Sequence, residues 1–315
     1  MALPSRWPSV VAIVGPTASG KSAVAIELAQ RLGAEVVNAD AFQVYRGMDI
    51  GTAKVPVTHR HGITHHLLDI LDISQDLSVA AYQQLARAVL AELASREVPA
   101  VVVGGSGLYV RALLDDLRFP GSDPAIRARW EQQLAELGAP SLHAVLAERD
   151  PEAAAHILPT NGRRVVRALE VGELTGEPFV AQLPHAGPPL ITHVSIGLDL
   201  DREMLDQRIQ LRVQGMIDAG FVDEVRHLLD HGLREARTAS RALGYPQMID
   251  LIDGRTDIDQ ARQDIVTGTR RFARRQQRWF RRDPRTTWLD ARIDPASTAS
   301  LIMARMAGQA RTLEA

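Results

Sequence analysis

The sequence predicts an α/β fold in which a parallel sheet flanked by helices is interrupted by an all-helical insertion. Short apolar runs alternate with helical patterns over residues 1–120, which is typical of a parallel sheet covered by helices. Residues 121–190 are rich in Ala and Arg and show little strand pattern. A further apolar run begins near residue 192, so we expect the sheet to resume within residues 191–315.

The composition is that of an ordinary globular protein and excludes several kinds of site. The 315 residues are 45% hydrophobic, 23% charged and only 4% aromatic, so aliphatic side chains must fill the core. Cysteine is absent, which excludes disulfides, thiolate zinc sites and a cysteine nucleophile. We find no signal peptide and no apolar stretch of about 18 residues, and therefore expect a cytoplasmic protein that does not associate with a membrane.

The charge distribution is more informative than the net charge of −2. Lys and Arg together number 36, yet Lys occurs only at Lys21 and Lys54. A site for a polyanion would therefore have to be a local surface of arginines.

The first predicted strand and helix enclose a phosphate-binding loop. Val10–Val14 is an apolar run suited to a buried strand, and AVAIELAQRL, which ends before Gly33, has a helical pattern. Between them, the pattern G-x-x-x-x-G-K-[ST] is matched by Gly15, Pro16, Thr17, Ala18, Ser19, Gly20, Lys21 and Ser22. Such a loop points backbone N–H groups at an anion, and the helix N-terminus adds positive charge. Lys21 would bind a diphosphate or triphosphate, Ser22 would coordinate Mg²⁺, and the sheet would be P-loop NTPase-like.

The remaining predicted strands and helices alternate along the chain. Glu35 to Val37 is predicted as the second strand, with Asp40 just past its end. A helix is predicted from Leu77 to Arg96, and Ala100 to Val103 is the third strand, followed by GGSG and a helical LYVRALL. After a linker at residues 184–189, a strand returns from Thr192. The C-terminal third is predicted to be helical, and the tail beyond residue 301 to be either a loose helix or disordered.

The phosphate loop alone leaves several functions open. A small-molecule kinase of this class would hold Mg²⁺ with an acid placed after a strand, and Asp40 could be that acid. A non-catalytic RNA-binding regulator with a phosphate loop is a further alternative. The kinase would consume ATP without needing RNA, whereas the regulator would bind RNA without forming a product. The long polar stretch from Asn38 to Lys54, dense in special side chains, argues against the kinase.

At this stretch the chain resembles the bacterial tRNA dimethylallyltransferase family, also called the tRNA isopentenyltransferase or IPP transferase family. The resemblance extends over nearly the whole chain, in the runs GPTASGKS, DxxQVYRGMDIGTAK, HHLLDILD, VVVGGSGLYVRAL, NGRRVVRALEV, QRIQLRV, SRALGYPQM and TRRFARRQQRWFRRD. It implies transfer of a dimethylallyl group from dimethylallyl diphosphate to N6 of the adenine adjacent to the anticodon. The products would be N6-isopentenyladenine and pyrophosphate. The phosphate loop, Lys21 and Mg²⁺ would then stabilise the leaving pyrophosphate.

The resemblance also implies roles for individual residues. Asp40 matches the family's general base, which would take a proton from the weakly nucleophilic adenine N6. Arg212 matches a functionally important arginine of the family, expected to make a contact either with the diphosphate or in closure of the site. Ser106 replaces the usual Thr but keeps a hydroxyl for the adenine. Ala41 and Phe42 replace Ser and Met, and Phe42 could either stack on a base or belong to the core.

An enzyme that modifies a stacked base must flip it out and hold the RNA nearby through phosphate contacts. Family segments that contact tRNA match Asp40, Ala41, Phe42, Gln43, Ser106, Arg127, Arg163, Arg164, Val165, Val166, Arg167, Arg241, Ala242, Leu243, Gly244, Tyr245 and Pro246. The resemblance thus implies that the anticodon stem-loop of tRNA is the partner. The run from Ser240 to Gln247 is predicted to be a loop because it contains Gly244 and Pro246.

Residues 269–283 predict a helix with one cationic face. At ~100° per residue, seven arginines fall within an arc of about 140°. They are Arg270, Arg271, Arg274, Arg275, Arg278, Arg281 and Arg282. Because like charges at i,i+4 repel and no acid is interspersed, we favour a polyanion surface over a solvated face with acidic partners. Arg274 and Arg278 are expected to contact tRNA. An enzyme that acts on free adenylate would need neither this helix nor the insertion.

A group of four histidines is interpreted as structural. His59, His61, His65 and His66 suggest a metal site, but they form no helical H-x-x-x-H pattern and no thiol is available. We therefore expect packing or hydrogen-bonding roles for them. No coiled-coil seam is found, so a monomer without an obligate protein partner is expected.

Overall fold

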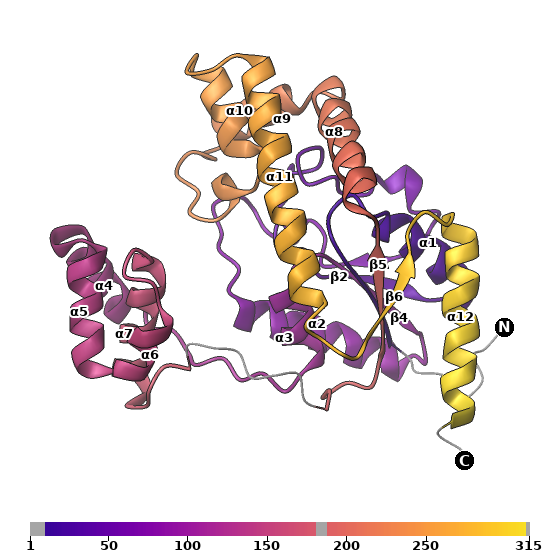
Figure 1. Cartoon of the computed structure of the whole chain (residues 1–315), viewed down its shortest axis with the longest axis horizontal. Helices are drawn as coiled ribbons and strands as arrows, with labels where there is room; N and C mark the ends of the chain where they lie inside the picture. Colours follow the sequence, from indigo (N-terminus) through magenta and orange to yellow (C-terminus); the bar gives the residue numbers. More distant parts are fainter. Residues whose placement is uncertain (1–9, 181–187, 313–315) are drawn as a thin grey trace. The chain divides into compact units, whose positions relative to one another are not determined.

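The computed structural model describes residues 10–180 and 188–312. The chain forms two compact units, one made of Met1–Asp116 with Pro188–Ala315 and the other of Leu117–Gly187 (Figure 1). The smaller unit is thus an insertion in the sequence of the larger one. Of the predicted linker at 184–189, residues 184–187 lie outside the described residues.

The larger unit is built on one six-stranded, all-parallel sheet, which confirms the predicted α/β fold. Its strands lie in the order β3-β2-β4-β1-β5-β6. They are β1 (Val10–Val14), β2 (Glu35–Asn38), β3 (His65–His66), β4 (Ala100–Val103), β5 (Val194–Asp199) and β6 (Thr286–Asp290). The central β1 pairs with β4 through Val11 and Val101 and with β5 through Val11 and Val194. The two outer strands, β3 and β6, were not predicted.

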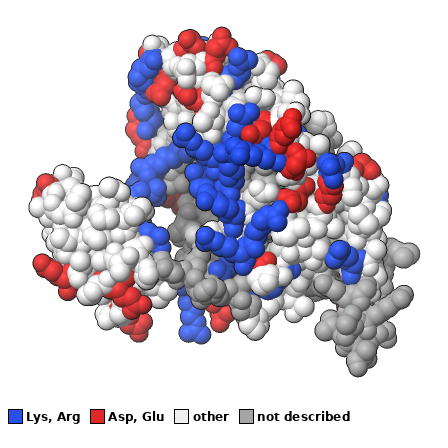
Figure 2. All heavy atoms as spheres, viewed as in Figure 1, with Lys and Arg blue, Asp and Glu red and all other residues white. Residues whose placement is uncertain are grey.

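Helices cover both faces of this sheet, so its strands are apolar on both sides. Successive residues of β1 alternate between two hydrophobic clusters: Val11 and Ile13 belong to one, and Val10 and Ala12 to the other. The helices are α1 (Lys21–Leu32), α2 (Val79–Ser95), α3 (Gly107–Leu114), α8 (Arg202–Asp218), α9 (Phe221–Asp230), α10 (Tyr245–Ile252), α11 (Ile258–Phe280) and α12 (Pro295–Thr312), with short 3₁₀ turns at Val57–His59 and Ala239–Arg241. From residue 301 to Thr312, where the described part of the chain ends, the tail therefore belongs to α12. Lys and Arg side chains gather over the face where α11 lies (Figure 2).

The insertion is an all-helical unit with its own core. It contains α4 (Pro124–Leu137), α5 (Ala139–Arg149), α6 (Pro151–His156) and α7 (Gly162–Thr175). Trp130, Leu142 and Leu169 lie at its centre. Asp123 and Asp150 cap α4 and α6 by accepting hydrogen bonds from the first backbone N–H groups, and a proline follows each of them. None of the described helices in either unit is long and apolar enough to cross a membrane.

Candidate active site

The predicted phosphate loop connects β1 to α1 and leaves the start of that helix free for a ligand. Gly15 has a φ of 135°, and a Cβ there would lie 2.8 Å from the backbone oxygen of Leu198, so no other residue fits. Gly20 precedes α1 with a φ of 89° and supplies no side-chain cap. The first N–H groups of α1 therefore remain available to an anion.

A cavity opens beside this loop, at the edge of the sheet where β1, β2 and β4 end. It is lined by Thr17, Lys21, Ser22, Asn38, Asp40, Gln43, Thr52, Ala53, Val103, Gly104, Gly105, Arg212, Phe272 and Gln276. Parallel strands place the segments that follow them at one edge, which is the usual position of a ligand in such folds. Three of the predicted catalytic residues, Lys21, Asp40 and Arg212, thus line one cavity. The fourth, Ser106, follows Gly105, and its Oγ accepts a hydrogen bond of 3.3 Å from the Ala41 N–H.

The cavity places two cations and one carboxylate in a partly desolvated space. Burial, and then the neighbouring Arg212, lower the pKa of Lys21 to about 7, while Asp40 acts in the opposite direction. Burial likewise lowers the pKa of Arg212, again with an opposing effect of Asp40. Lys21 Nζ donates a hydrogen bond of 2.6 Å to the Pro16 carbonyl oxygen. Asp40 is a single carboxylate beside two cationic side chains, so an anion in the cavity would supply further counter-charge.

Asp40 is held in a fixed orientation by its own turn. Its Oδ1 accepts hydrogen bonds from the N–H groups of Phe42, at 2.9 Å, and Gln43, at 3.4 Å. The Asp40 N–H donates to Asn38 Oδ1 at 3.0 Å, and Asn38 Nδ2 donates to the Leu67 carbonyl at 3.1 Å. No residue in the described part of the chain forms a hydrogen bond with Oδ2 of Asp40. This oxygen is therefore the one that can accept a proton from a ligand.

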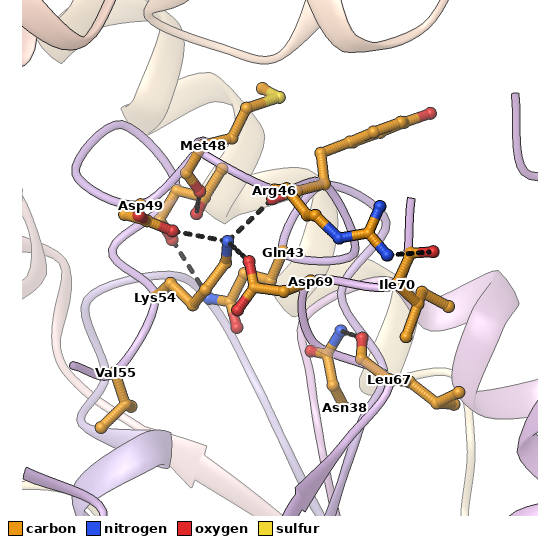
Figure 3. Close-up of polar contacts among 12 residues, drawn as sticks. Asn38, Gln43, Arg46, Met48, Asp49, Lys54, Val55, Leu67, Asp69 and Ile70 are labelled. Atoms are coloured by element: carbon orange, nitrogen blue, oxygen red, sulfur yellow. Dashed lines mark hydrogen bonds and ion pairs between the residues drawn. The ribbon is translucent and has the colours of Figure 1, made fainter. Parts of the chain in front are cut away.

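The wall of the cavity that carries Gln43 and Thr52 is anchored by Lys54 (Figure 3). The Lys54 ammonium is buried and donates to the Tyr45 carbonyl at 2.8 Å, to Asp49 Oδ1 at 2.6 Å and to Asp69 Oδ1 at 2.5 Å. Three acceptors around one nitrogen suit an ammonium group, whereas a planar guanidinium would not fit the same space. Lys54 is one of two lysines in a chain that otherwise uses arginine, and this rarity is the signal in the sequence that marks it.

Glu224 of α9 holds the tip of the same loop. Its carboxylate accepts hydrogen bonds from the backbone N–H groups of Asp49, Ile50 and Gly51, at 2.9, 2.6 and 3.1 Å. The Tyr245 hydroxyl donates to it at 2.7 Å. A Cβ at Gly51 would lie 2.3 Å from the ring of Phe221, so the loop sits directly on that ring. The sequence did not single out Glu224 because its partners lie far away along the chain.

The predicted RNA-contacting run at residues 241–246 requires correction. Only part of Ser240–Gln247 is a loop, because α10 begins at Tyr245 and tolerates Pro246 in its first turn, where the missing N–H has no partner to lose. Tyr245 and Ala242 are fully buried, and the Tyr245 hydroxyl is engaged by Glu224, so neither side chain is available to RNA. Arg241 is exposed and remains a candidate contact.

In the insertion, buried Glu170 organises two of the predicted RNA-contacting arginines. Its carboxylate accepts from Ser122 Oγ at 2.7 Å, from Arg127 at 2.7 Å and from Arg167 at 2.9 Å. Burial favours the neutral acid, but these hydrogen bonds outweigh it and lower the pKa of Glu170. Arg167 also donates to the Gly121 carbonyl at 3.0 Å, so it holds the start of the insertion in place.

The other members of the predicted run in α7 divide by exposure. Arg163 and Arg164 are exposed. Val165 and Val166 are buried in the core of the insertion, and their side chains cannot contact tRNA in this conformation. The predicted tRNA contact of Val165 and Val166 is therefore replaced by a supporting role in the core behind α7.

The predicted cationic helix is the C-terminal part of α11, which begins earlier than expected, at Ile258. Ala273, Gln276 and Phe280 are buried on one face, as predicted. Exposed arginines occupy the opposite face, namely Arg271, Arg274, Arg275, Arg278, Arg281 and Arg282. The expectation that this face lacks acidic partners is wrong in part. Asp206 lies 3.5 Å from Arg270 and 3.7 Å from Arg274, and Asp199 lies 2.5 Å from Arg281.

Four arginines of α11 and the turn that follows it keep an unbalanced positive charge. Within the described ranges, no ion pair is formed by Arg271, Arg275, Arg278 or Arg282. The cationic group over α11 in Figure 2 is therefore only partly neutralised.

Phe42 and the histidines have local roles. Phe42 is half-buried and packs against the larger hydrophobic cluster, which favours the core alternative for its ring. His65 Nδ1 lies 2.9 Å from the Ile63 carbonyl oxygen, and His66 Nε2 lies 2.6 Å from Glu35. Among the residues that the structure describes, no group of three or more His, Asp or Glu side chains could hold a metal ion by itself.

Comparisons with known proteins agree on one family. The model of the IPP transferase family matches residues 43–283. The tRNA dimethylallyltransferase of Kineococcus radiotolerans is 59% identical over 288 residues, which is 90% of each chain. The full-length tRNA isopentenylpyrophosphate transferase of Bacillus halodurans is 39% identical, with a TM-score of 0.69 over 97% of this chain and 98% of that one. A eukaryotic dimethylallyltransferase acting on tRNA is 26% identical, with a TM-score of 0.75 over 90% of this chain and 73% of that one.

Proposed function

Because the chain belongs to the IPP transferase family, we propose that it transfers a dimethylallyl group from dimethylallyl diphosphate to N6 of the adenine next to the anticodon in tRNA. The observation that best supports this reaction is the cavity in which Lys21 and Arg212 face Asp40 at the end of the phosphate loop. It combines a place for an anionic leaving group with a carboxylate for a proton.

In this reaction the C1–O bond of the diphosphate breaks, and pyrophosphate leaves with the electron pair. The N6 lone pair of adenine forms the new bond to C1, and one N6 proton passes to Asp40 Oδ2. The loop N–H groups, Lys21 and Arg212 would stabilise the charge that develops on the leaving oxygen. Asp40 would act as general base, a role typically worth about 10²–10⁴-fold in rate.

Mg²⁺ is the metal that we propose for this site, and the residues present fit it. Ser22 lines the cavity next to Lys21, so its hydroxyl is available to the ion beside the diphosphate site. Mg²⁺ is usually held by one or two protein oxygens, substrate phosphates and water rather than by a full protein cage. The ion would neutralise part of the diphosphate charge. The Ser19 hydroxyl in the same loop is buried and has no hydrogen-bond partner in the described part of the chain.

For tRNA, we propose contacts on each unit separately. On the larger unit they are Arg241 and the arginines of α11, including Arg274 and Arg278. On the insertion they are Arg127, Arg163, Arg164 and Arg167, of which Arg127 and Arg167 are oriented by Glu170. We further propose that the enzyme acts as a monomer.

A transfer assay tests the proposed function. Purified protein is mixed with unmodified tRNA, Mg²⁺ and labelled dimethylallyl diphosphate, and label in the RNA is counted. A parallel reaction contains ATP and small acceptors without RNA. Label in the tRNA at the adenine beside the anticodon is expected. ATP turnover with a small acceptor and no labelled RNA would instead support the kinase alternative.

A further inference from the structure

One buried side chain of α11 contacts both loops that form the cavity. Gln276 is 5% exposed and lies on the helix face opposite the exposed arginines. Its Oε1 accepts a hydrogen bond of 2.8 Å from the Thr17 N–H in the phosphate loop. Its Nε2 donates a hydrogen bond of 3.0 Å to the Gly105 carbonyl oxygen in the loop after β4. The two ends of a single amide group therefore join segments that lie far apart in the sequence.

α11 packs so closely against the loop after β4 that a side chain at Gly105 or Gly107 would clash with it. A Cβ at Gly105 would lie 2.2 Å from Gln276 Nε2, and a Cβ at Gly107 would lie 2.1 Å from the ring of Trp279. Gln276 and Trp279 are three residues apart on the helix and so lie on the same face. The contacts at Gly105 and Gly107 together fix the position of the loop against the helix.

The two loops serve different halves of the reaction. Thr17 belongs to the loop that would hold the diphosphate, together with Lys21. Gly105 precedes Ser106, whose hydroxyl is bonded to the backbone next to Asp40, the proposed acceptor of the adenine proton. The separation of Thr17 and Gly105 thus sets how far the leaving group lies from the acceptor base.

We propose that Gln276 is a positioning residue that holds these two loops at the spacing required for transfer. This inference rests on the proposed function, because it assigns the diphosphate to one loop and the base to the other. Reacting atoms must lie about 3–3.5 Å apart, and a displacement of about 1 Å can lower a rate by about 10²-fold. The residue acts through the two loops and does not itself take part in bond formation.

The test compares two neighbouring glutamines. Gln276→Met keeps the length of the side chain and removes both hydrogen bonds. Gln277→Met is the matched control, since Gln277 is half-buried on the same helix and its Nε2 donates to Asp199 Oδ1 of β5 at 2.7 Å, not to either loop. For each variant, one measures the single-turnover rate at saturating substrates, the dissociation constants of pyrophosphate and tRNA, and the unfolding midpoint.

We expect Gln276→Met to lower the single-turnover rate by about 10- to 100-fold, while both dissociation constants change by less than about threefold. Gln277→Met should stay within about twofold of the wild-type rate. A rate loss that is equal in the two variants, or that follows the fraction of folded protein, would overturn the proposal. A purely structural role of Gln276 predicts a rate loss that follows the fraction of folded protein.

A second variant covers the case in which Gln276→Met does not fold. Gln276→Glu keeps the shape and the acceptor for the Thr17 N–H, but it places a carboxylate against the Gly105 carbonyl. A slow but folded Gln276→Glu supports the proposal, and a wild-type rate in it refutes the proposal. If the wild-type chain itself transfers no label to tRNA, the proposed function fails. If it is active and Gln276 is dispensable, only this inference fails.

Discussion

At the scale of single residues, Asp40 allows the sharpest test of the chemistry. Asp40→Asn keeps an oxygen that can accept from the Phe42 and Gln43 N–H groups, so the local turn survives. The amide cannot take the N6 proton, and we expect kcat to fall at least about 10²-fold with little change in tRNA affinity. Steady-state transfer and filter binding measure the two effects. Full activity would remove Asp40 from the role of base. Asp72→Asn, at an exposed ion pair with Arg46, is the control.

Lys21 gives a prediction for pH. Because its pKa is lowered to about 7, Lys21 is charged below pH 7 in the free protein and becomes neutral above it. A bound anion favours the charged form, so above pH 7 binding must take up a proton. We therefore expect pyrophosphate affinity to weaken as pH rises from 7 to 9, by up to about tenfold per unit.

The matched control for this pH effect is Lys21→Arg, which stays charged over the whole range. Titration of pyrophosphate itself affects both proteins equally, so the difference between their affinity profiles isolates Lys21. Parallel profiles, measured by calorimetry, would show that Lys21 does not titrate in this range.

The sequence identified these two residues because each stands in a local motif. Lys21 lies in the phosphate-loop pattern, and Asp40 follows a predicted strand. Gln276 and Glu224 could not be found in the same way. The hydrogen-bond partners of Gln276 are Thr17 and Gly105, and those of Glu224 include Asp49, so their roles exist only in the folded chain.

At the scale of an element, α11 combines an inner face that contacts the active-site loops with an outer face of arginines. We expect Arg274→Gln with Arg278→Gln to weaken tRNA binding and to reduce the slope of log affinity against log salt by about 0.7–0.9 for each phosphate that is no longer neutralised. Arg278 should have the larger effect, because Arg274 already lies 3.7 Å from Asp206. Filter binding at several salt concentrations measures this slope.

Arg255→Gln provides the comparison for these variants, since Arg255 is exposed but paired with Asp250 and Asp253. It should leave the slope unchanged. If the two substitutions in α11 also leave the slope unchanged, the arginine face does not contact the RNA backbone.

Helical periodicity predicted which side of α11 is buried, but not where the helix begins or which acids reach it. Ile258 precedes the arginine-rich run, and Asp206 and Asp199 come from α8 and β5. The short strand β3 was missed because two residues, His65 and His66, cannot display an alternating pattern. Pairing with β2, not local propensity, makes it a strand.

At the scale of the whole molecule, the order of strands and helices along the sequence was sufficient to predict the four inner strands of the sheet, but not the outer strands β3 and β6. Buried apolar runs such as Val10–Val14 and Ala100–Val103 have few alternatives to a central parallel strand. The loop from Gln43 to Lys54 was not predictable as structure, because Lys54 and Glu224 hold it through contacts from distant segments.

The separate core of the insertion leads to the last prediction. The chain enters and leaves the larger unit at neighbouring points, since the Ile191 N–H donates to the Leu114 carbonyl at 3.1 Å. A short Gly/Ser linker can therefore replace residues 117–187. The hydrophobic clusters of the larger unit contain no residue of the insertion, so we expect that unit to fold.

In this deletion variant we expect pyrophosphate affinity to remain within about threefold of wild type, because the whole phosphate loop is retained. We expect tRNA affinity to fall by at least about tenfold, since the arginines of α4 and α7 are removed and each phosphate that they neutralise adds to binding. Calorimetry with pyrophosphate serves as the internal control for folding. Wild-type tRNA binding by a variant that still binds pyrophosphate would show that the insertion does not contact RNA and would confine recognition to α11 and its neighbours.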